Sequence, residues 1–234
     1  MNPVSETYNM DCMEYMKNIP DKWFDLAICD PPYGINQGGH KNHTRGTKRN
    51  PAKAYKPFDD KNSPDKKYFD ELFRISKNQI IFGANHFISK IPLDSSCWIV
   101  WDKDNGNNDF ADCELAWTSF TNKAVRKFKY RWNGMFQEKM KHKEIRIHPT
   151  QKPIHLYSFL LTKYAKQGYR IFDSHLGSGS SRIAAYKLGY DFYATEIDND
   201  YFAAQEERFH KECFGEIKLT NNVIVKQTYL FDEL

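Results

Sequence analysis

The feature that most constrains the fold is a pair of prolines at the end of an apolar run. Residues 24–29, Phe-Asp-Leu-Ala-Ile-Cys, predict a buried strand, and Asp30-Pro31-Pro32-Tyr33 follows it directly. Because consecutive prolines neither extend a sheet nor enter a helix interior, the chain must turn sharply there. In open α/β sheets, ligands bind at the carboxyl ends of the strands. The turn therefore predicts a site that gathers a carboxylate, a backbone carbonyl and an aromatic ring.

These three groups suit a planar base that carries an amino group. The Asp30 carboxylate and the Pro31 carbonyl can accept both amino hydrogens, and the Tyr33 ring can stack on the base. A loop whose aspartate caps a helix is the alternative interpretation of the same four residues.

A second site is predicted late in the chain. Residues 171–181, Ile-Phe-Asp-Ser-His-Leu-Gly-Ser-Gly-Ser-Ser, indicate a strand, a tight turn and a helix start. Gly177 and Gly179 let the backbone approach a ligand, and the helix start offers free N–H donors. Glu196 closes the next strand, where an acid can bind ribose hydroxyls. The unit predicts a nucleoside site. The third glycine of G-x-G-x-x-G is absent, which favours a cofactor smaller than a dinucleotide; a turn that binds nothing is the alternative.

Charge is distributed unevenly along the 234 residues. Residues 37–57 contain six Lys or Arg and no acid, and residues 123–146 contain nine Lys or Arg and two Glu, yet the whole chain carries only +4. An acidic body with two basic segments predicts a surface for a polyanion. Aromatic residues interleave with these charges, as in nucleic-acid grooves: Tyr55, Phe128, Tyr130, Trp132 and Phe136. Two solvated basic loops are the alternative.

Apolar patterning predicts alternating strands and helices. The expected strands are 24–29, 79–82, 97–101, 114–118, 125–131, 170–173 and 190–195. The expected helices are 10–18, 64–77, 153–167, 179–188 and 199–213. This alternation predicts a mostly parallel sheet with helices on both faces. Residues 35–60 predict a long basic loop suited to ordering on its ligand.

Other features bound the class of protein. No apolar run approaches the ~18 residues that a membrane span needs, and the N-terminal residues lack a signal-peptide pattern. Five cysteines without a C-x-x-C pair argue against a disulfide framework and against a Cys-rich zinc site. We therefore expect a cytoplasmic protein that contacts no membrane and needs no metal.

Taken in their order, these motifs resemble those of the S-adenosylmethionine-dependent DNA amino-methyltransferases. Asp30-Pro31-Pro32-Tyr33 resembles the catalytic D/N/S-P-P-Y/F/W motif, residues 172–180 resemble the D-P-F-x-G-S-G-T cofactor loop, and residues 148–153 resemble H-P-T-Q-K-P. Here Ser174-His175 replace Pro-Phe, and Ser180 replaces Thr. The catalytic motif precedes the cofactor loop, as in the circularly permuted beta-type branch. The resemblance covers roughly residues 8–34 and 147–205 and implies a single Rossmann-like α/β domain over 1–234.

The resemblance also implies roles for particular residues. The catalytic set is Asp30, Pro31, Pro32 and Tyr33. The expected contacts to S-adenosylmethionine are Asp11, Cys12, Asp30, Thr150, Lys152, Asp173, His175, Gly177, Ser178, Gly179, Ser180, Glu196 and Ile197. The expected contacts to double-stranded DNA are Lys41, Arg45, Lys48, Arg49, Arg126, Lys129 and Arg131, within the basic loop at about 35–60 and a small recognition insertion within about 102–146.

The most specific expectation is adenine-N6 methylation of DNA, since D-P-P-Y favours adenine. Cytosine-N4 methylation of DNA and adenine-N6 methylation of RNA use the same chemistry and stay open. Protein-glutamine methylation, a nicotinamide-dependent oxidoreductase and a non-catalytic nucleic-acid-binding module are further alternatives.

Two expectations concern macromolecular partners. Gln227-Thr228-Tyr229-Leu230-Phe231 resembles the short peptide that bacterial proteins insert into the sliding clamp, although a terminal strand packed on the body is the alternative. A homodimer is one option for the oligomeric state, because dimers are frequent among similar enzymes.

Overall fold

The computed structural model describes residues 2–38, 55–106, 111–133, 136–218 and 224–226. Its centre is an eight-stranded sheet with the order β1-β10-β9-β2-β3-β5-β4-β6. The strands in that order are β1 (Ser5–Tyr8), β10 (Asp191–Thr195), β9 (Arg170–Asp173), β2 (Phe24–Cys29), β3 (Ser76–Phe82), β5 (Cys113–Thr118), β4 (Ile99–Asp102) and β6 (Arg126–Lys129). The first five are parallel, β5 is antiparallel to both its neighbours, and β6 is parallel to β4.

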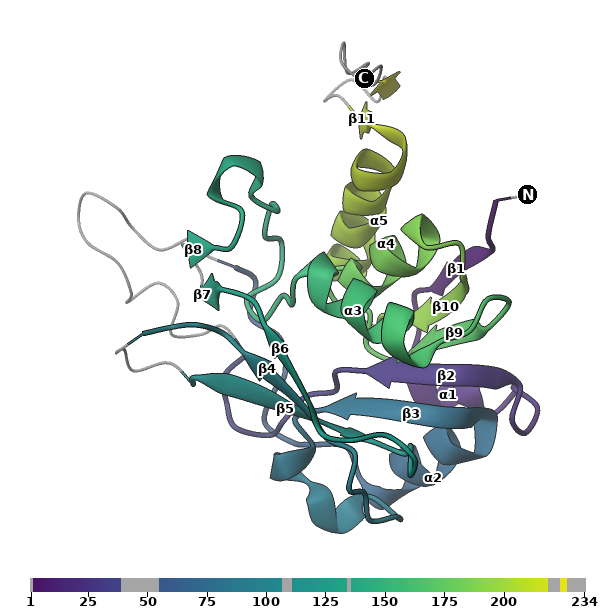
Figure 1. Cartoon of the computed structure of the whole chain (residues 1–234). Helices are drawn as coiled ribbons and strands as arrows, with labels where there is room; N and C mark the ends of the chain where they lie inside the picture. The colour runs from purple at the N-terminus through teal and green to yellow at the C-terminus, as the bar shows by residue number, and fades with distance from the viewer. Residues whose placement is uncertain (1, 39–54, 107–110, 134–135, 219–223, 227–234) are drawn as a thin grey trace.

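Helices cover both faces of this sheet, as Figure 1 shows. On one face lie α1 (Cys12–Met16) and α2 (Lys66–Ile75). On the other side lie α3 (Ile154–Tyr164), α4 (Ser180–Lys187) and α5 (Asn199–Phe214). The arrangement confirms the predicted Rossmann-like fold with its mostly parallel sheet.

The core explains why the strand at residues 24–29 is an apolar run. Leu26 and Ile28 pack in the layer under α3, whereas Ala27 and Cys29 pack in the layer with α2. Since successive strand side chains point to opposite faces, a strand covered on both sides must be apolar at nearly every position.

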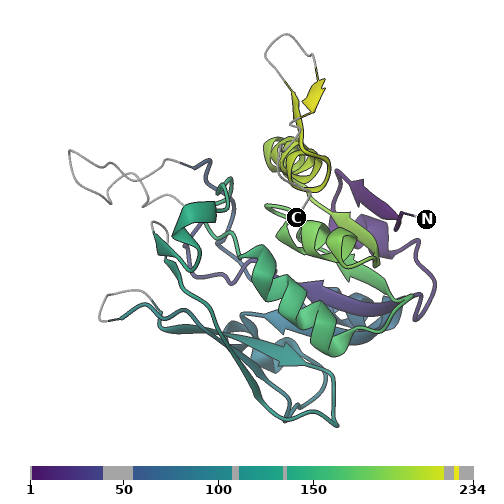
Figure 2. The ribbon, with the colours of Figure 1, turned by 45° about the horizontal axis from the view of Figure 1, so that its top comes forward.

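Shorter elements lie outside the main sheet. They are the 3-10 helices η2 (Ala84–His86), η3 (Ile88–Lys90) and η4 (Met140–His142), the pair β7 (Trp132–Asn133) and β8 (Phe136–Gln137), and the hairpin β11 (Glu216–Lys218) and β12 (Ile224–Lys226). Figure 2 shows this hairpin beyond the end of α5, away from the sheet.

The predicted recognition insertion at 102–146 is partly built into the sheet. Strands β5 and β6 belong to the sheet, so the described residues of this range that lie outside it are 103–106, 111–112, 119–125, 130–133 and 136–146. Residues 136–146 project at the end of the sheet where β2 and β3 finish (Figure 1).

All the predicted strands and helices are present, with small shifts at their ends. The sequence did not predict β1, the 3-10 helices or β7 and β8. The proposed clamp-binding segment, residues 227–231, lies outside the described residues. Within the described ranges, no helix is both long and apolar enough to span a bilayer.

Candidate active site

The catalytic turn and the glycine-rich turn leave the same edge of the sheet. Strands β2 and β9 are parallel neighbours, with Ala27 opposite Phe172. Asp30 follows the end of β2, and Asp173 is the last residue of β9. The two carboxylates therefore lie near one another, and the negative charge of Asp30 contributes to the environment of Asp173.

The Asp30 carboxylate is held on both oxygens by protein donors. The Tyr33 hydroxyl donates to Oδ1 at 2.8 Å, and Lys152 Nζ donates to Oδ2 at 2.5 Å. The Asp30 side chain is 17% exposed. Burial raises the pKa of the Asp30 carboxyl above its usual value, although the Lys152 ammonium opposes the shift.

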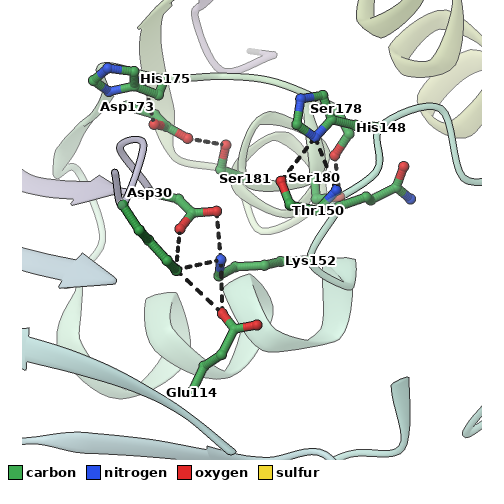
Figure 3. Close-up of polar contacts among 12 residues, drawn as sticks. Asp30, Glu114, His148, Thr150, Lys152, Asp173, His175, Ser178, Ser180 and Ser181 are labelled. Carbon is green, nitrogen blue, oxygen red and sulfur yellow. Dashed lines mark hydrogen bonds and ion pairs between the residues drawn. The ribbon is translucent and has the colours of Figure 1, made fainter. Parts of the chain in front are cut away.

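Lys152 and Glu114 extend this contact into a cluster of charges (Figure 3). Lys152 Nζ lies 3.0 Å from Glu114 Oε2 and 3.1 Å from the Tyr33 hydroxyl. Glu114 is the second residue of β5 and also pairs with Lys103. Burial alone would raise the pKa of Glu114, but the two ammonium groups outweigh it and hold the pKa at about 2. Glu114 is therefore ionised at neutral pH.

The turn after Asp30 is clamped by a second aspartate. Asp60, which is 5% exposed, accepts the backbone N–H groups of Tyr33 at 2.8 Å, Gly34 at 2.9 Å and Gln37 at 2.8 Å. Gly34 has a φ of +75°, which favours glycine. These hydrogen bonds fix the backbone position of Tyr33. The Tyr33 ring stacks on the His86 ring, with ring centroids 5.2 Å apart.

The glycine-rich turn is closed against the end of β10. Glu196 accepts Gly177 N–H at 2.7 Å on one oxygen and Asp198 N–H at 2.9 Å on the other. A Cβ added at Gly177 would meet nothing nearer than the His175 carbonyl at 4.0 Å, so the backbone faces open space. Gly179 instead packs against Gln205, where a Cβ would lie 3.2 Å from that side chain.

Ser174 and His175 fit the turn through a partner on α2. The Ser174 and Tyr68 hydroxyls are hydrogen-bonded at 2.6 Å, and Ser174 also contacts His175 Nδ1 at 2.8 Å. The His175 and Tyr68 rings meet edge to face with centroids 5.6 Å apart. Burial lowers the pKa of His175 to about 4, so this imidazole is neutral at pH 7.

Asp173 lies beneath the turn rather than in solvent. It accepts the Ser181 hydroxyl at 2.6 Å and the His175 N–H at 3.1 Å. Burial, together with the charges of Asp30 and Glu196, raises the pKa of Asp173 to about 7.

A cavity of about 250 Å³ connects the two turns. Its walls include Pro32 from the catalytic turn, His175 from the glycine-rich turn, and Cys12 and Met13 from α1. Asp11, expected to contact the cofactor, caps α1 by accepting the N–H groups of Met13 and Glu14. Ile197, also expected there, is 67% exposed just after Glu196.

Four other predicted cofactor contacts are bonded to protein groups in the structure. Ser178 and Ser180 are buried, and Arg208 holds the Ser178 carbonyl at 2.7 Å and the Ser180 hydroxyl at 2.9 Å. Their side of the turn is therefore anchored to α5. Thr150 is exposed and lies against His148 Nδ1 at 3.1 Å. The Lys152 ammonium, also an expected cofactor contact, pairs with Asp30 and Glu114.

The predicted DNA contacts are not all brought together. Lys41, Arg45, Lys48 and Arg49 lie outside the described residues. Lys129 and Arg131 both pair with Asp104, at 2.9 Å and 2.8 Å, at the edge of the sheet that carries Asp30. Arg126 starts β6 opposite Ile99 and lies at the other edge, because β6 runs parallel to β4. Arg126 is therefore away from the catalytic turn, and its contact with DNA stays a prediction.

Sequence reasoning missed three residues of this site. Glu114 sits at a strand start, Asp60 lies 27 residues beyond Tyr33, and Tyr68 is on an amphipathic helix. None of them belongs to a recognisable motif, so only the tertiary structure reveals their contacts.

Comparisons with known proteins agree with the geometry. A family model described as DNA methylase matches residues 100–207. The type II methyltransferase M2.DpnII of Streptococcus pneumoniae is 22% identical, over 86% of this chain and 88% of its own length. A DNA modification methylase from Thermus thermophilus, solved with S-adenosylmethionine, has a TM-score of 0.56 at 17% identity, covering 89% of this chain and 94% of that one. The structure of the cytosine-N4-specific PvuII DNA methyltransferase has a TM-score of 0.56 at 13% identity. The match covers 95% of this chain and 89% of that one.

In sequence and in fold, the chain is therefore similar to DNA amino-methyltransferases, and the cofactor that this similarity implies is S-adenosylmethionine. The residues present fit that cofactor. The backbone at Gly177 is open, a carboxylate closes the neighbouring strand, and a cavity separates the glycine-rich turn from Pro32.

Proposed function

We propose that this protein methylates the N6 amino group of adenine in double-stranded DNA, on a base flipped out of the duplex. The observation that carries the proposal is the position of Asp30. Its carboxylate stands at the carboxyl end of β2, beside the glycine-rich turn of β9, and one cavity touches both turns. A methyl donor bound at one turn and a base bound at the other would share that space.

The residues of the catalytic turn would activate the amino group. An aromatic amine is a poor nucleophile because its lone pair is delocalised into the ring. Hydrogen bonds from the amino group to the Asp30 carboxylate and the Pro31 carbonyl draw that lone pair toward a tetrahedral geometry. Positive charge develops on the nitrogen during attack, and the preorganised carboxylate stabilises it.

The cofactor would be held by the other turn. S-adenosylmethionine would supply there a methyl group on a positively charged sulfur, and the amino nitrogen that takes up the methyl group would release its proton to solvent. Glu196 would bind the ribose, the Gly177 backbone would lie against the donor, and Asp11 and Cys12 would face the adenine end. Holding donor and base in line adds a proximity effect to the rate.

Tyr33 would receive the flipped base. The target amino group is inaccessible inside a duplex, so the base must leave the stack and pack on an aromatic ring. In the structure the Tyr33 hydroxyl already occupies one oxygen of Asp30. An incoming amino group must therefore share that oxygen with the hydroxyl or displace it.

The choice of adenine rests on the first residue of the D-P-P-Y motif. The form S-P-P-Y is more often associated with cytosine N4, and Asp30 stands in that position here. Cytosine-N4 methylation of DNA is the second candidate, and RNA adenine methylation is the third.

Nucleoside analysis tests the proposal. Purified protein is incubated with S-adenosylmethionine and unmethylated genomic DNA or total RNA, and the nucleic acid is digested for mass spectrometry. We expect N6-methyldeoxyadenosine in DNA, and none without the cofactor. N4-methyldeoxycytidine would establish the second candidate, and methylated adenosine confined to RNA the third. Absence of every methylated nucleoside would refute all three.

A further inference from the structure

Two buried charges beside Asp30 have no part in the reaction described above. Lys152, with a side chain only 3% exposed, donates to Asp30 at 2.5 Å and lies 3.0 Å from Glu114. Its ammonium also lies 4.9 Å from the centre of the Phe82 ring. A lysine so deeply buried is costly unless it is paired, and here two carboxylates compensate it.

The backbone that carries Lys152 is fixed on both sides. Trp132 donates its indole N–H to the Gln151 carbonyl at 2.7 Å, and the Gln151 side chain accepts Ile147 N–H at 2.9 Å. Pro153 is buried and precedes the first turn of α3. The Lys152 side chain is therefore aimed at Asp30 by its surroundings, rather than drawn there from a flexible loop.

Lys152 and Glu114 act on Asp30 with opposite signs. The ammonium favours the ionised form of the Asp30 carboxyl, whereas the Glu114 carboxylate disfavours it. With Lys103 paired to Glu114, the four formal charges sum to zero. The Lys152 ammonium thus opposes the rise in the pKa of Asp30 that burial and Glu114 cause.

We propose that Lys152 is a positioning residue that holds the Asp30 carboxylate in a fixed orientation and favours its ionised form, and that Glu114 holds Lys152 in place while moderating its effect. The inference rests on the proposed function, in which the Asp30 carboxylate stabilises the positive charge that develops on the amino nitrogen. In this proposal Lys152 acts on Asp30, whereas the sequence predicted that Lys152 contacts the cofactor.

The other titratable groups that face Asp30 are identified by the structure. They are Tyr33 on the same turn, Tyr157 on α3 and Asp173 on β9. None of them carries positive charge at neutral pH. Lys152 is therefore the cation on which ionisation of Asp30 depends, among the described residues that face it.

The test follows the Asp30 carboxyl itself, without cofactor or DNA. Protein labelled with carbon-13 at its aspartate carboxyls is titrated by NMR, and Asp30→Asn assigns the resonance. The variants are Lys152→Met, which keeps the length and apolar packing of the side chain, and Glu114→Gln. An opposite charge within a few ångströms moves a carboxyl midpoint by about one to three pH units. We expect Lys152→Met to move the Asp30 midpoint upward by that amount and Glu114→Gln to move it downward.

Two outcomes would overturn the assignment: midpoints unchanged in both variants, or midpoints that move in the same direction. If Lys152→Met does not fold, Glu114→Gln decides alone, through a downward shift or its absence. Because the titration uses no substrate, it stands apart from the proposed function. If the wild-type protein methylates DNA, its methylation rate can also be measured against pH. In Lys152→Met the acidic side of this pH profile should shift to higher pH, and activity should recover at high pH. A loss equal at every pH would indicate a merely structural lysine.

Discussion

Asp60 offers the sharpest test of how the catalytic turn is held. Its carboxylate accepts three backbone N–H groups, those of Tyr33, Gly34 and Gln37, all at 2.8–2.9 Å. In Asp60→Asn the amide oxygen can still accept from Tyr33 and Gly34. The amide nitrogen must then face the Gln37 N–H, so one hydrogen bond is replaced by two opposed donors.

The size of the effect follows from the bond that is lost. A hydrogen bond to a charged group contributes about 1.5–3 kcal/mol, which corresponds to a factor of about 10 to 150 in an equilibrium constant. Only the clamped turn presents Asp30 and Tyr33 together. We therefore expect kcat to fall by up to that factor in Asp60→Asn and further in Asp60→Ala, while the affinity for S-adenosylmethionine changes far less.

The assay is single-turnover transfer of a labelled methyl group to DNA, with cofactor affinity measured by calorimetry and folding by circular dichroism. Asp59→Asn is the matched control, because Asp59 is exposed and its carboxylate accepts only the nearby Lys61 N–H at 3.0 Å among the hydrogen bonds described. If Asp60→Asn turned over as fast as Asp59→Asn, the clamp would have no role in catalysis.

Four further variants, at three residues, test other contacts. Glu196→Ala should weaken S-adenosylmethionine binding at least tenfold by calorimetry, since it removes the predicted ribose acceptor and frees Gly177; unchanged affinity would exclude it from the site. Tyr33→Ala should lose about 1–3 kcal/mol of base stacking in kcat/KM, whereas Tyr33→Phe should retain most activity; equal losses would contradict stacking. Tyr68→Phe should lower the free energy of unfolding by about 0.5–1.5 kcal/mol in urea, because Ser174 loses one partner, and no change would show that this bond is neutral.

The local sequence predicted those parts of the fold whose signals are local. The strand at 24–29 is apolar at nearly every position and ends at two prolines, and the strand at 170–173 ends at a glycine-rich turn; both appear as expected. Strand β1 was missed because Ser5-Glu6-Thr7-Tyr8 is polar and short, as suits an edge strand that only needs β10 as a partner.

The site was predictable as two motifs but not as one charge cluster. The resemblance predicted that the Asp30 turn and the glycine-rich turn share one site, and strands β2 and β9, which carry them, are neighbours in the sheet. It did not predict Glu114 or Asp60, whose contacts depend on the antiparallel placement of β5 and on the chain returning after residue 54. Lys152 was identified from its motif, yet its buried partners follow from tertiary packing alone.

The central claim is tested most directly by measuring methyl transfer and cofactor binding on one variant, Asp30→Ala. Removing this carboxylate should abolish methyl transfer to DNA in single-turnover assays, because the amino group then loses its charged acceptor and the developing positive charge loses its stabilising partner. Calorimetry should still record S-adenosylmethionine binding, because the glycine-rich turn and Glu196 remain intact. Methylation at the wild-type rate in a folded Asp30→Ala protein would contradict the account.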